Sequence, residues 1–501
     1  MSEQLSIRDW GSVLVCLALL VTYLLLVDYL RKETLLAIGL YLLVLTVYLG
    51  WSWYVVEYHP EYRHVFSPRL FAVVLFLCTV AVGLVGWIPI SLIAFIHLGA
   101  LILIFSYWFV TVAALYHKLT PSERFDAVTE FPTITVIVPA YNEEGYISRT
   151  IVSLVAADYP EGKKQIVVVD DGSTDTTYEE ARQYESESIT VVSKENGGKY
   201  SALNYGLLFS DTEIVVMVDA DSIVESTALL DIVSPLVADS NVGAVASNVK
   251  IFNRDSLVTK CQTLEYIFGI NIYRRVFDHF ASVSVVPGCL GAYRRTALDE
   301  VNGYDPHTLT EDFDTTMKVL KQGYKVRFSE AVVYTEAPDT WRDLYNQRLR
   351  WYRGNIMTLK KHFFDTVSPE NHYLRRVHLP LALVTMVFVP LASWVILGLI
   401  VYIAITSGIA ELFFVFIIFL SIIVLSNLIA IRIEGESPWY VLYAPLFVIG
   451  YKHFHDLVMV KSIIDVLRGT DMGWTNASRI DQRDATSTEL STETLSERAK
   501  E

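Results

Sequence analysis

Residues 165–175 have the sequence QIVVVDDGSTD, in which an uninterrupted apolar run stops at two adjacent carboxylates. Residues 133–144, TITVIVPAYNEE, and residues 213–221, EIVVMVDAD, follow the same plan. A short continuous apolar run is typical of a strand that is buried on both faces of a parallel sheet. The three segments therefore predict an α/β sheet with acidic residues at the ends of its strands.

Polar stretches of helical character separate these runs, which predicts βαβ units in one domain of about 230 residues. We expect strands at 133–138, 165–169, 190–193 and 213–218, and helices at 143–157 and 200–209. Ligands of open α/β sheets bind at the carboxyl ends of the strands. Acidic clusters gathered there would repel one another, so we expect a hard divalent cation that holds a diphosphate. Taken alone, each cluster could equally be an acidic turn or a helix N-cap.

The composition places this domain in a membrane protein. Of 501 residues, 52% are hydrophobic and 19% are charged, and the mean hydropathy is +0.38. The chain is too apolar to be disordered or to be an ordinary soluble enzyme. Its net charge of −15 argues against nucleic acid as a partner. The four cysteines are too few for a disulfide framework, and none forms the CxxC pair of a zinc or redox site.

Apolar stretches long enough to span a lipid bilayer lie toward both ends of the chain. They cover residues 11–27, 34–56, 70–88, 91–116, 381–405 and 412–431. A seventh stretch, 439–451, is short and contains Pro445, so it could span the membrane, re-enter it or lie on its surface. Basic loop residues such as Arg63 and Arg69 put the central domain on the cytoplasmic side by the positive-inside rule. We therefore expect a multi-pass cell-membrane protein with a cytoplasmic domain.

Six short motifs follow one another through the central region. They are Pro139-Ala-Tyr-Asn-Glu143, Asp170-Asp-Gly-Ser173, Asn196-Gly-Gly-Lys199, Asp219-Ala-Asp221, Thr310-Glu-Asp312 and Gln347-Arg-Leu-Arg-Trp351. In this order they resemble the inverting family 2 glycosyltransferases, within the membrane-embedded group that includes hyaluronan, chitin, cellulose and poly-N-acetylglucosamine synthases. The resemblance covers about residues 131–356. It implies a GT-A fold, with a Rossmann-like and mostly parallel sheet, inserted between N-terminal and C-terminal bundles of transmembrane helices.

The resemblance also assigns a donor site for a UDP-sugar. Its nucleotide-sugar-binding residues would be Tyr141, Glu143, Asp170, Asp171, Lys199, Asp219, Gln347 and Arg350. Asp219 and Asp221 would hold Mg²⁺ or Mn²⁺, which stabilises the leaving UDP as a Lewis acid.

Asp312 would be the catalytic base that inverting transfer requires, taking a proton from the acceptor hydroxyl. Its other interpretation is a first-turn acid of a helix that begins near Glu311. By the same resemblance, Trp351, Gly288 and Glu311 would contact the acceptor. Taken alone, residues 339–361 are typical of a cationic amphipathic helix at the membrane interface. The functional interpretation adds that Gln347, Arg350 and Trp351 turn inward.

The sequence thus predicts a membrane glycosyltransferase that uses a UDP-sugar, a glycan or lipid-linked acceptor and the lipid bilayer, and no nucleic acid. Processive synthesis of a β-linked polysaccharide is the favoured form, and addition of a single sugar is the alternative. A transporter or sensor whose domain only binds a nucleotide is a third possibility. The expected parts are a transmembrane region at 1–119 with about four helices, the GT-A domain at 120–338, interfacial helices at 339–376, a second transmembrane region at 377–468 with two or three helices, and a disordered tail at 469–501.

Overall fold

The computed structural model describes residues 110–118, 130–306, 308–367, 389–406, 410–448 and 450–469, together with the single residues 107, 128 and 386. The chain divides into two compact units, one of residues 1–108 with 392–426 and one of residues 109–391 with 427–501. The expected spans at 11–27, 34–56 and 70–88, most of 91–116, and the tail after Gly469 lie outside the described residues. The second unit contains the α/β domain.

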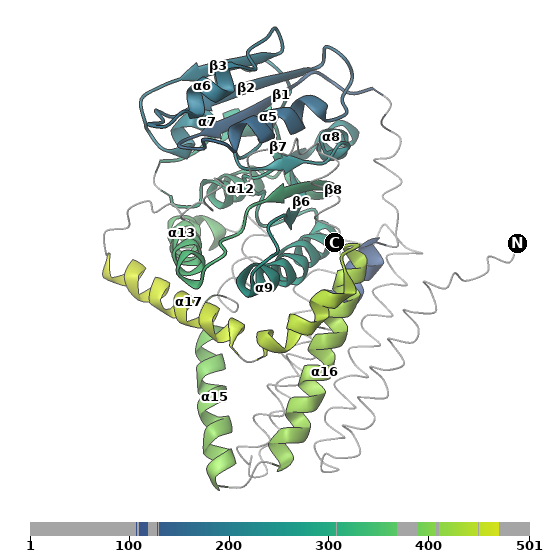
Figure 1. The fold of residues 1–501 in the computed structure, drawn as a ribbon, viewed down its shortest axis with the longest axis vertical. Coiled ribbons are helices and arrows are strands. Elements are labelled where there is room, and N and C mark those ends of the chain that lie inside the picture. Colours follow the sequence, from purple (N-terminus) through teal and green to yellow (C-terminus); the bar gives the residue numbers. More distant parts are fainter. Residues whose placement is uncertain are drawn as a thin grey trace, which may run out of the picture. The chain divides into compact units, whose positions relative to one another are not determined.

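A mixed eight-stranded sheet forms the centre of this domain, in the order β3-β2-β1-β4-β7-β6-β8-β5 (Figure 1). Its strands are β1 (Ile134–Ala140), β2 (Lys164–Asp170), β3 (Ile189–Ser193), β4 (Ile214–Met217), β5 (Ile223–Val224), β6 (Val242–Ile251), β7 (Gly291–Arg294) and β8 (Lys325–Thr335). Strands β1 to β4 pair in parallel, and β6 pairs in parallel with β8. β7 is antiparallel to both β4 and β6, and β5 is antiparallel to β8. The expected parallel sheet is therefore confirmed for its first half, and the second half is mixed.

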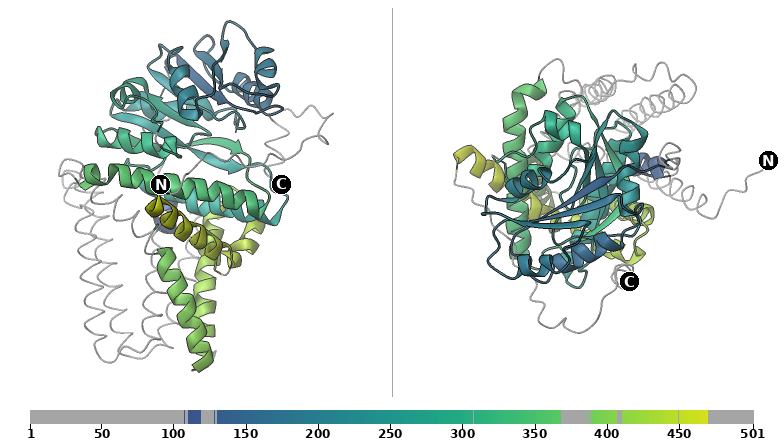
Figure 2. Two further views of the ribbon diagram at one scale, coloured as in Figure 1. Left: turned by 90° about the vertical axis from the view of Figure 1, so that its left-hand side faces the viewer. Right: turned by 90° about the horizontal axis from the view of Figure 1, so that it is seen from above.

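Helices cover both faces of the sheet (Figure 2). The period-2 alternation of β1 sends Val136 to one core and Ile137 to the other. The first core packs against α5 (Ile147–Ala156), α6 (Thr177–Arg182) and α8 (Ala228–Ala238). The second packs against α7 (Lys199–Leu207), α11 (Arg295–Glu300) and α12 (Glu311–Lys321). This double cover explains why the first four strands are continuous apolar runs.

The remaining elements follow the sheet's second half and the end of the chain. They are α9 (Leu257–Glu265), the π-helix η2 (Tyr266–Ile272), α10 (Tyr273–Asp278), α13 (Trp341–Val367), α15 (Val389–Thr406), α16 (Ala410–Ile433), the 3₁₀-helix η5 (Pro438–Phe447) and α17 (Tyr451–Arg468). Helices α13 and α17 lie side by side in the unit that holds the sheet (Figures 1 and 2).

Two of these helices, α15 and α16, overlap the expected spans at 381–405 and 412–431. Within the parts of the chain that the structure describes, no helix meets the combined length and apolarity that a membrane crossing requires.

A short acidic turn after α16, Glu434-Gly-Glu436, is buried against the α/β domain. Arg275 donates from Nε to Glu434 Oε1 at 2.7 Å, and Asn248 donates to Glu434 Oε2 at 2.7 Å. Arg254 donates to the two oxygens of Glu436 at 2.6 and 3.2 Å. The side chains of Arg275 and Glu434 are both completely buried, which makes this turn an internal part of the domain.

Candidate active site

The two carboxylates that end β2 are buried and organise the loop that leads into α7. Asp171 accepts hydrogen bonds from Lys194 Nζ at 2.7 Å and from the backbone N–H of Gly198 at 2.7 Å and Gly197 at 3.1 Å. Gly198 has a φ of +87°, which a residue with a Cβ rarely adopts. Asp170 accepts from Ser193 Oγ at 2.8 Å. Asp171, expected like Asp170 to contact the donor, therefore also fixes the backbone that precedes Lys199.

Lys199 begins α7 and lies between two acidic residues from different elements. Its Nζ is 2.5 Å from Asp219 Oδ1, just beyond β4, and 3.1 Å from Glu311 Oε1, at the start of α12. Burial by itself would lower the pKa of Lys199, but the charges of Asp219 and Glu311 outweigh it and raise that pKa well above its ordinary value. The amine is therefore fully charged near pH 7 and is held where three of the motifs meet.

Asp219 and Asp221 are the residues expected to hold a divalent cation. Burial raises the pKa of Asp219, and the charge of Asp221 raises it further against the opposing effect of Lys199. Among the described residues, no group of three or more His, Cys, Asp or Glu side chains is arranged to hold a metal ion. Mg²⁺ is commonly held by one or two carboxylates with substrate phosphates and water as further ligands. Asp219 and Asp221 repel each other as carboxylates, and a divalent cation between them and a diphosphate would relieve this repulsion.

Gly288 covers the ion pair between Lys199 and Asp219. A Cβ at this position would lie 2.5 Å from Lys199 Nζ and 3.1 Å from Asp219 Oδ2. The structure thus places Gly288 beside the donor residues, in the loop that precedes β7. A side chain at this position would have to push the Lys199 amine away from its place beside Asp219.

The proposed base, Asp312, lies in the first turn of α12, which agrees with both interpretations of its sequence position. Phe313 donates its backbone N–H to Asp312 Oδ1 at 2.7 Å. Burial and the negative charge of Glu311 raise the pKa of Asp312 to about 6, against the opposing effect of Lys199. Burial would also raise the pKa of Glu311, but the positive charges of Lys199 and Arg350 hold it below its ordinary value. The pKa values of these two adjacent carboxyl groups are therefore shifted in opposite directions, which is typical of acid–base sites.

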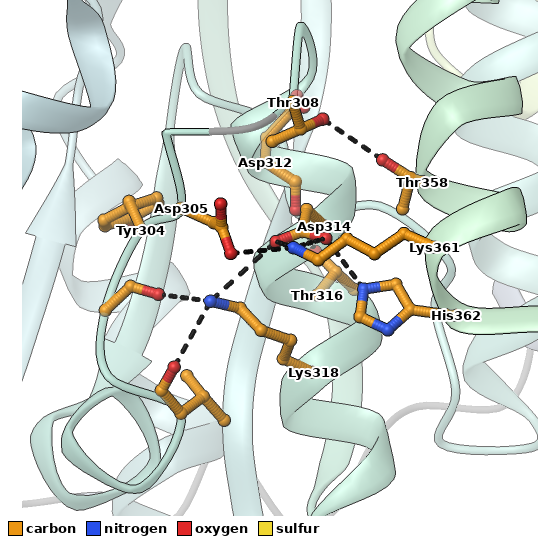
Figure 3. A network of polar contacts seen from close by, with 12 residues as sticks. Tyr304, Asp305, Thr308, Asp312, Asp314, Thr316, Lys318, Thr358, Lys361 and His362 are labelled. Carbon is orange, nitrogen blue, oxygen red and sulfur yellow. Dashed lines mark hydrogen bonds and ion pairs between the residues drawn. The ribbon is translucent and has the colours of Figure 1, made fainter. Parts of the chain in front are cut away.

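A third acid of the same helix, Asp314, fixes α12 to α13 (Figure 3). Its completely buried carboxylate accepts from Lys361 Nζ at 2.9 Å and from His362 Nε2 at 2.7 Å. Figure 3 shows Asp312 and Asp314 projecting in different directions, with only Asp314 in contact with α13. Thr310, just before α12, lies against Gly354 of α13, where a Cβ would come within 2.7 Å of the Thr310 side chain. These close contacts set the position of Asp312.

The residues of the Gln347–Trp351 motif on α13 differ in how deeply they are buried. Arg348 is completely buried, whereas Gln347, Arg350 and Trp351 are partly exposed. The guanidinium of Arg348 lies over the Trp351 ring, 4.1 Å from its centroid, and donates to Gln347 Oε1 at 2.5 Å. In the sequence, Arg348 is one of several basic residues of the expected interfacial helix. Nothing in the local pattern distinguishes it from Arg350, because its partner lies 83 residues away.

Two of the expected donor residues lie at the edge of the site. Tyr141 follows β1 and is 37% exposed, so its ring is available to a ligand. Glu143 donates its backbone N–H to Thr177 Oγ1 at 2.7 Å. Asn142, between them, has a φ of +55° and accepts from the backbone N–H of Thr174 at 2.8 Å. The structure thus joins the ends of β1 and β2 into one rim.

The mixed α/β sheet, with acidic motifs at its strand ends, is similar in fold to the GT-A type of glycosyltransferase domain. Residues 132–354 match the model of the family described as "Glycosyltransferase like family 2". The chain is similar in fold to a mannosyltransferase from Pyrobaculum calidifontis whose structure holds GDP-Man and Mn²⁺, with a TM-score of 0.54, 22% identity, and coverage of 76% of this chain and all of that one.

Two curated proteins are also similar to this chain in sequence. The poly-beta-1,6-N-acetyl-D-glucosamine synthase of Staphylococcus aureus (strain MSSA476) is 30% identical over 272 residues, which are 52% of this chain and 65% of the relative. The probable glycosyltransferase YdaM of Bacillus subtilis (strain 168) is 31% identical over 240 residues, which are 46% of this chain and 57% of the relative. The chain therefore matches somewhat less than two thirds of the length of these relatives.

Proposed function

We propose that this chain is a membrane glycosyltransferase that transfers a sugar from a UDP-sugar to a glycan or lipid-linked acceptor with inversion, and that it synthesises a β-linked polysaccharide processively. The observation that carries the proposal is the meeting of Lys199, Asp219, Glu311 and Asp312. It joins the positive charge that a diphosphate needs to a carboxyl group of raised pKa.

The donor half of the reaction uses the ends of β2 and β4. Lys199 would leave its carboxylates to contact the diphosphate, and the Gly197–Gly198 backbone that Asp171 holds lets the ligand approach closely. Arg350 would add a second positive charge. Mg²⁺ or Mn²⁺, held by Asp219 and Asp221, would supply Lewis-acid stabilisation of the leaving UDP.

The transfer step needs one proton acceptor. The acceptor hydroxyl attacks the anomeric carbon while Asp312 takes its proton, and the bond between that carbon and the β-phosphate oxygen breaks as UDP leaves with the electron pair. Attack on the face opposite the leaving group inverts the anomeric centre. A carboxyl pKa of about 6 is close enough to cytoplasmic pH for Asp312 to be ionised before attack and to hold the proton afterward.

The acceptor half would lie along α13. Trp351 would offer an aromatic face for a sugar ring, and Gly288 and Glu311, which lie beside Lys199, would contact the acceptor as well. The apolar stretches at 381–405 and 412–431, with those before residue 117, support a location in the cell membrane with the catalytic domain in the cytoplasm. The name of the staphylococcal relative makes UDP-N-acetylglucosamine the first donor to test.

Membranes that contain the chain, incubated with radiolabelled UDP-sugars and Mg²⁺ or Mn²⁺, test the proposal. We expect one UDP-sugar to be consumed and its sugar to appear in a product of high molecular mass. A product one sugar longer than its acceptor would replace the processive form by single-sugar addition. If no UDP-sugar is hydrolysed or transferred, the proposed enzymatic function is wrong, and a nucleotide-binding transporter or sensor takes its place.

A further inference from the structure

A buried chain of polar contacts leads from α17 to Trp351. Arg348 Nη2 donates to Glu265 Oε2 at 2.9 Å, and the hydroxyl of Tyr451 donates to the same oxygen at 2.5 Å. Tyr451 begins α17, and Glu265 ends α9 where the π-helix η2 begins. Three elements that are far apart in sequence therefore meet at one carboxylate.

Arg348 is the member of this chain that touches the proposed site. Its guanidinium contacts residues on both sides of it in the motif, because it donates to Gln347 and lies over the Trp351 ring. A cation on one face of an indole ring leaves the opposite face for a sugar ring. The orientation of Trp351 therefore depends on where Arg348 is held.

The position of Arg348 depends in turn on its carboxylate partner. The guanidinium is completely buried, so its charge needs Glu265 beside it. Burial lowers the pKa of His455, the other basic side chain near Glu265, to about 4, and its ring is therefore neutral near pH 7. His455 instead shares a hydrogen bond of 2.7 Å with the hydroxyl of Tyr352 and packs against the Tyr451 ring, 4.6 Å between centroids.

We propose that Arg348 is a positioning residue of the acceptor site, which Glu265 and the Tyr451 hydroxyl hold against one face of Trp351. Helix α17 thereby takes part in acceptor binding without touching the acceptor. The inference rests on the proposed function, because it takes Trp351 as the side chain on which the acceptor sugar stacks.

The same two helices offer a matched control. Arg353 of α13 donates from Nε to Asp465 Oδ2 of α17 at 3.0 Å, and Lys461 donates to the same carboxylate. This pair also joins α13 to α17, but it is made of side chains other than those that hold Arg348 against Trp351. Asp465→Asn therefore weakens the contact between the helices and leaves the chain of contacts to Trp351 intact.

The experiment uses the full chain in lipid nanodiscs, with UDP-N-acetylglucosamine as donor and short β-linked N-acetylglucosamine oligosaccharides as acceptors. Tyr451→Phe removes one hydrogen bond and Arg348→Lys removes the planar guanidinium but keeps the charge. We expect both to raise the acceptor KM about three- to tenfold, to raise the share of UDP released without transfer, and to leave the donor KM within about twofold. Asp465→Asn should change neither KM by more than about twofold.

Arg348→Met leaves Glu265 without its cation, so its thermal melt is measured first, and a variant that does not fold is set aside in favour of Tyr451→Phe. Equal changes in the donor and acceptor KM of Tyr451→Phe and Arg348→Lys, or an acceptor KM that rises as much in Asp465→Asn, would show a structural role and overturn the inference. Absence of transfer by the unaltered chain with every donor would instead overturn the proposed function, and the inference with it.

Discussion

The raised pKa of Asp312 predicts how the transfer rate changes with pH. A base of pKa about 6 is ionised to about nine tenths at pH 7 and about one tenth at pH 5, so kcat/KM for the donor should fall about tenfold between them. An aspartate with the ordinary pKa of 3.8 would lose less than about a tenth over that range. Stopped incubations with radiolabelled UDP-sugar from pH 5 to pH 8 measure the profile, and isothermal titration of UDP at each pH separates loss of donor binding from loss of the base.

The neighbouring charge gives this prediction its control. Because Glu311 raises the pKa of Asp312, Glu311→Gln should move the midpoint of the profile to lower pH, whatever it does to the maximal rate. Asp312→Asn should bind UDP and lose transfer at every pH. A flat profile between pH 5 and 7, or a midpoint that stays near 6 in Glu311→Gln, would refute the assignment of the titrating base. Loss of UDP binding in Asp312→Asn would make that residue a structural helix-start acid.

Three further predictions concern other parts of the domain. Gly288→Ala should raise the donor KM about tenfold because its Cβ would displace Lys199 Nζ from Asp219, whereas Gly398→Ala, with no atom within 4 Å of the added Cβ, should leave it unchanged; steady-state kinetics compare the two. Asp314→Asn should lower the free energy of unfolding by about 3–5 kcal/mol, since it leaves Lys361 and His362 without a buried carboxylate; denaturant unfolding measures it, and a change below about 1 kcal/mol would contradict the anchoring role. Burial would raise the pKa of Asp278, but the hydrogen bonds that Arg327 and His117 donate to it hold this pKa at about 2 in the folded state, below the ordinary 3.8. The ionised Asp278 therefore stabilises the fold fully above about pH 4, and this stabilisation is lost as the pH falls toward 2. Thermal melts between pH 4 and pH 2 should show a smaller loss of stability in Asp278→Asn than in the unaltered chain.

The first half of the sheet could be predicted from sequence because each strand carries its own signal. The runs at 133–138, 165–169, 190–193 and 213–218 lie within a residue or two of β1 to β4. Strands β6 and β8 lack such runs, since VGAVASNVKI and KVRFSEAVVYT mix small, polar and charged residues. Their pairing depends on contacts between segments that are far apart along the chain, and a single sequence does not show these contacts. Helix α7 begins one residue before the expected start at 200, and α5 is shorter than 143–157.

The candidate site divides in the same way. The motifs pointed to Lys199, Asp219, Glu311 and Asp312, and the structure brings these four together, although it pairs Glu311 with Lys199, where the sequence suggested an acceptor contact. The roles of these residues stay predictions. The sequence did not point to Glu265, Tyr451 or His455, because each is an ordinary residue of its helix and acquires meaning only from its partners across 83 to 186 residues.

The buried Glu434-Gly-Glu436 turn bears on the order in which the protein folds during synthesis. Arg275 is translated 159 residues before Glu434. At about 5–20 residues per second, it leaves the ribosome roughly 8 to 30 seconds before this partner. During that interval Arg254 lacks Glu436, Asn248 lacks its acceptor Glu434, and Arg275 has only Glu330 as a carboxylate partner, so polar groups that the finished protein buries are not yet satisfied. A ribosome-bound chain stopped before residue 434 should therefore be more sensitive to protease than one stopped after residue 436. The α/β domain is in this sense completed by a segment that follows helix α16.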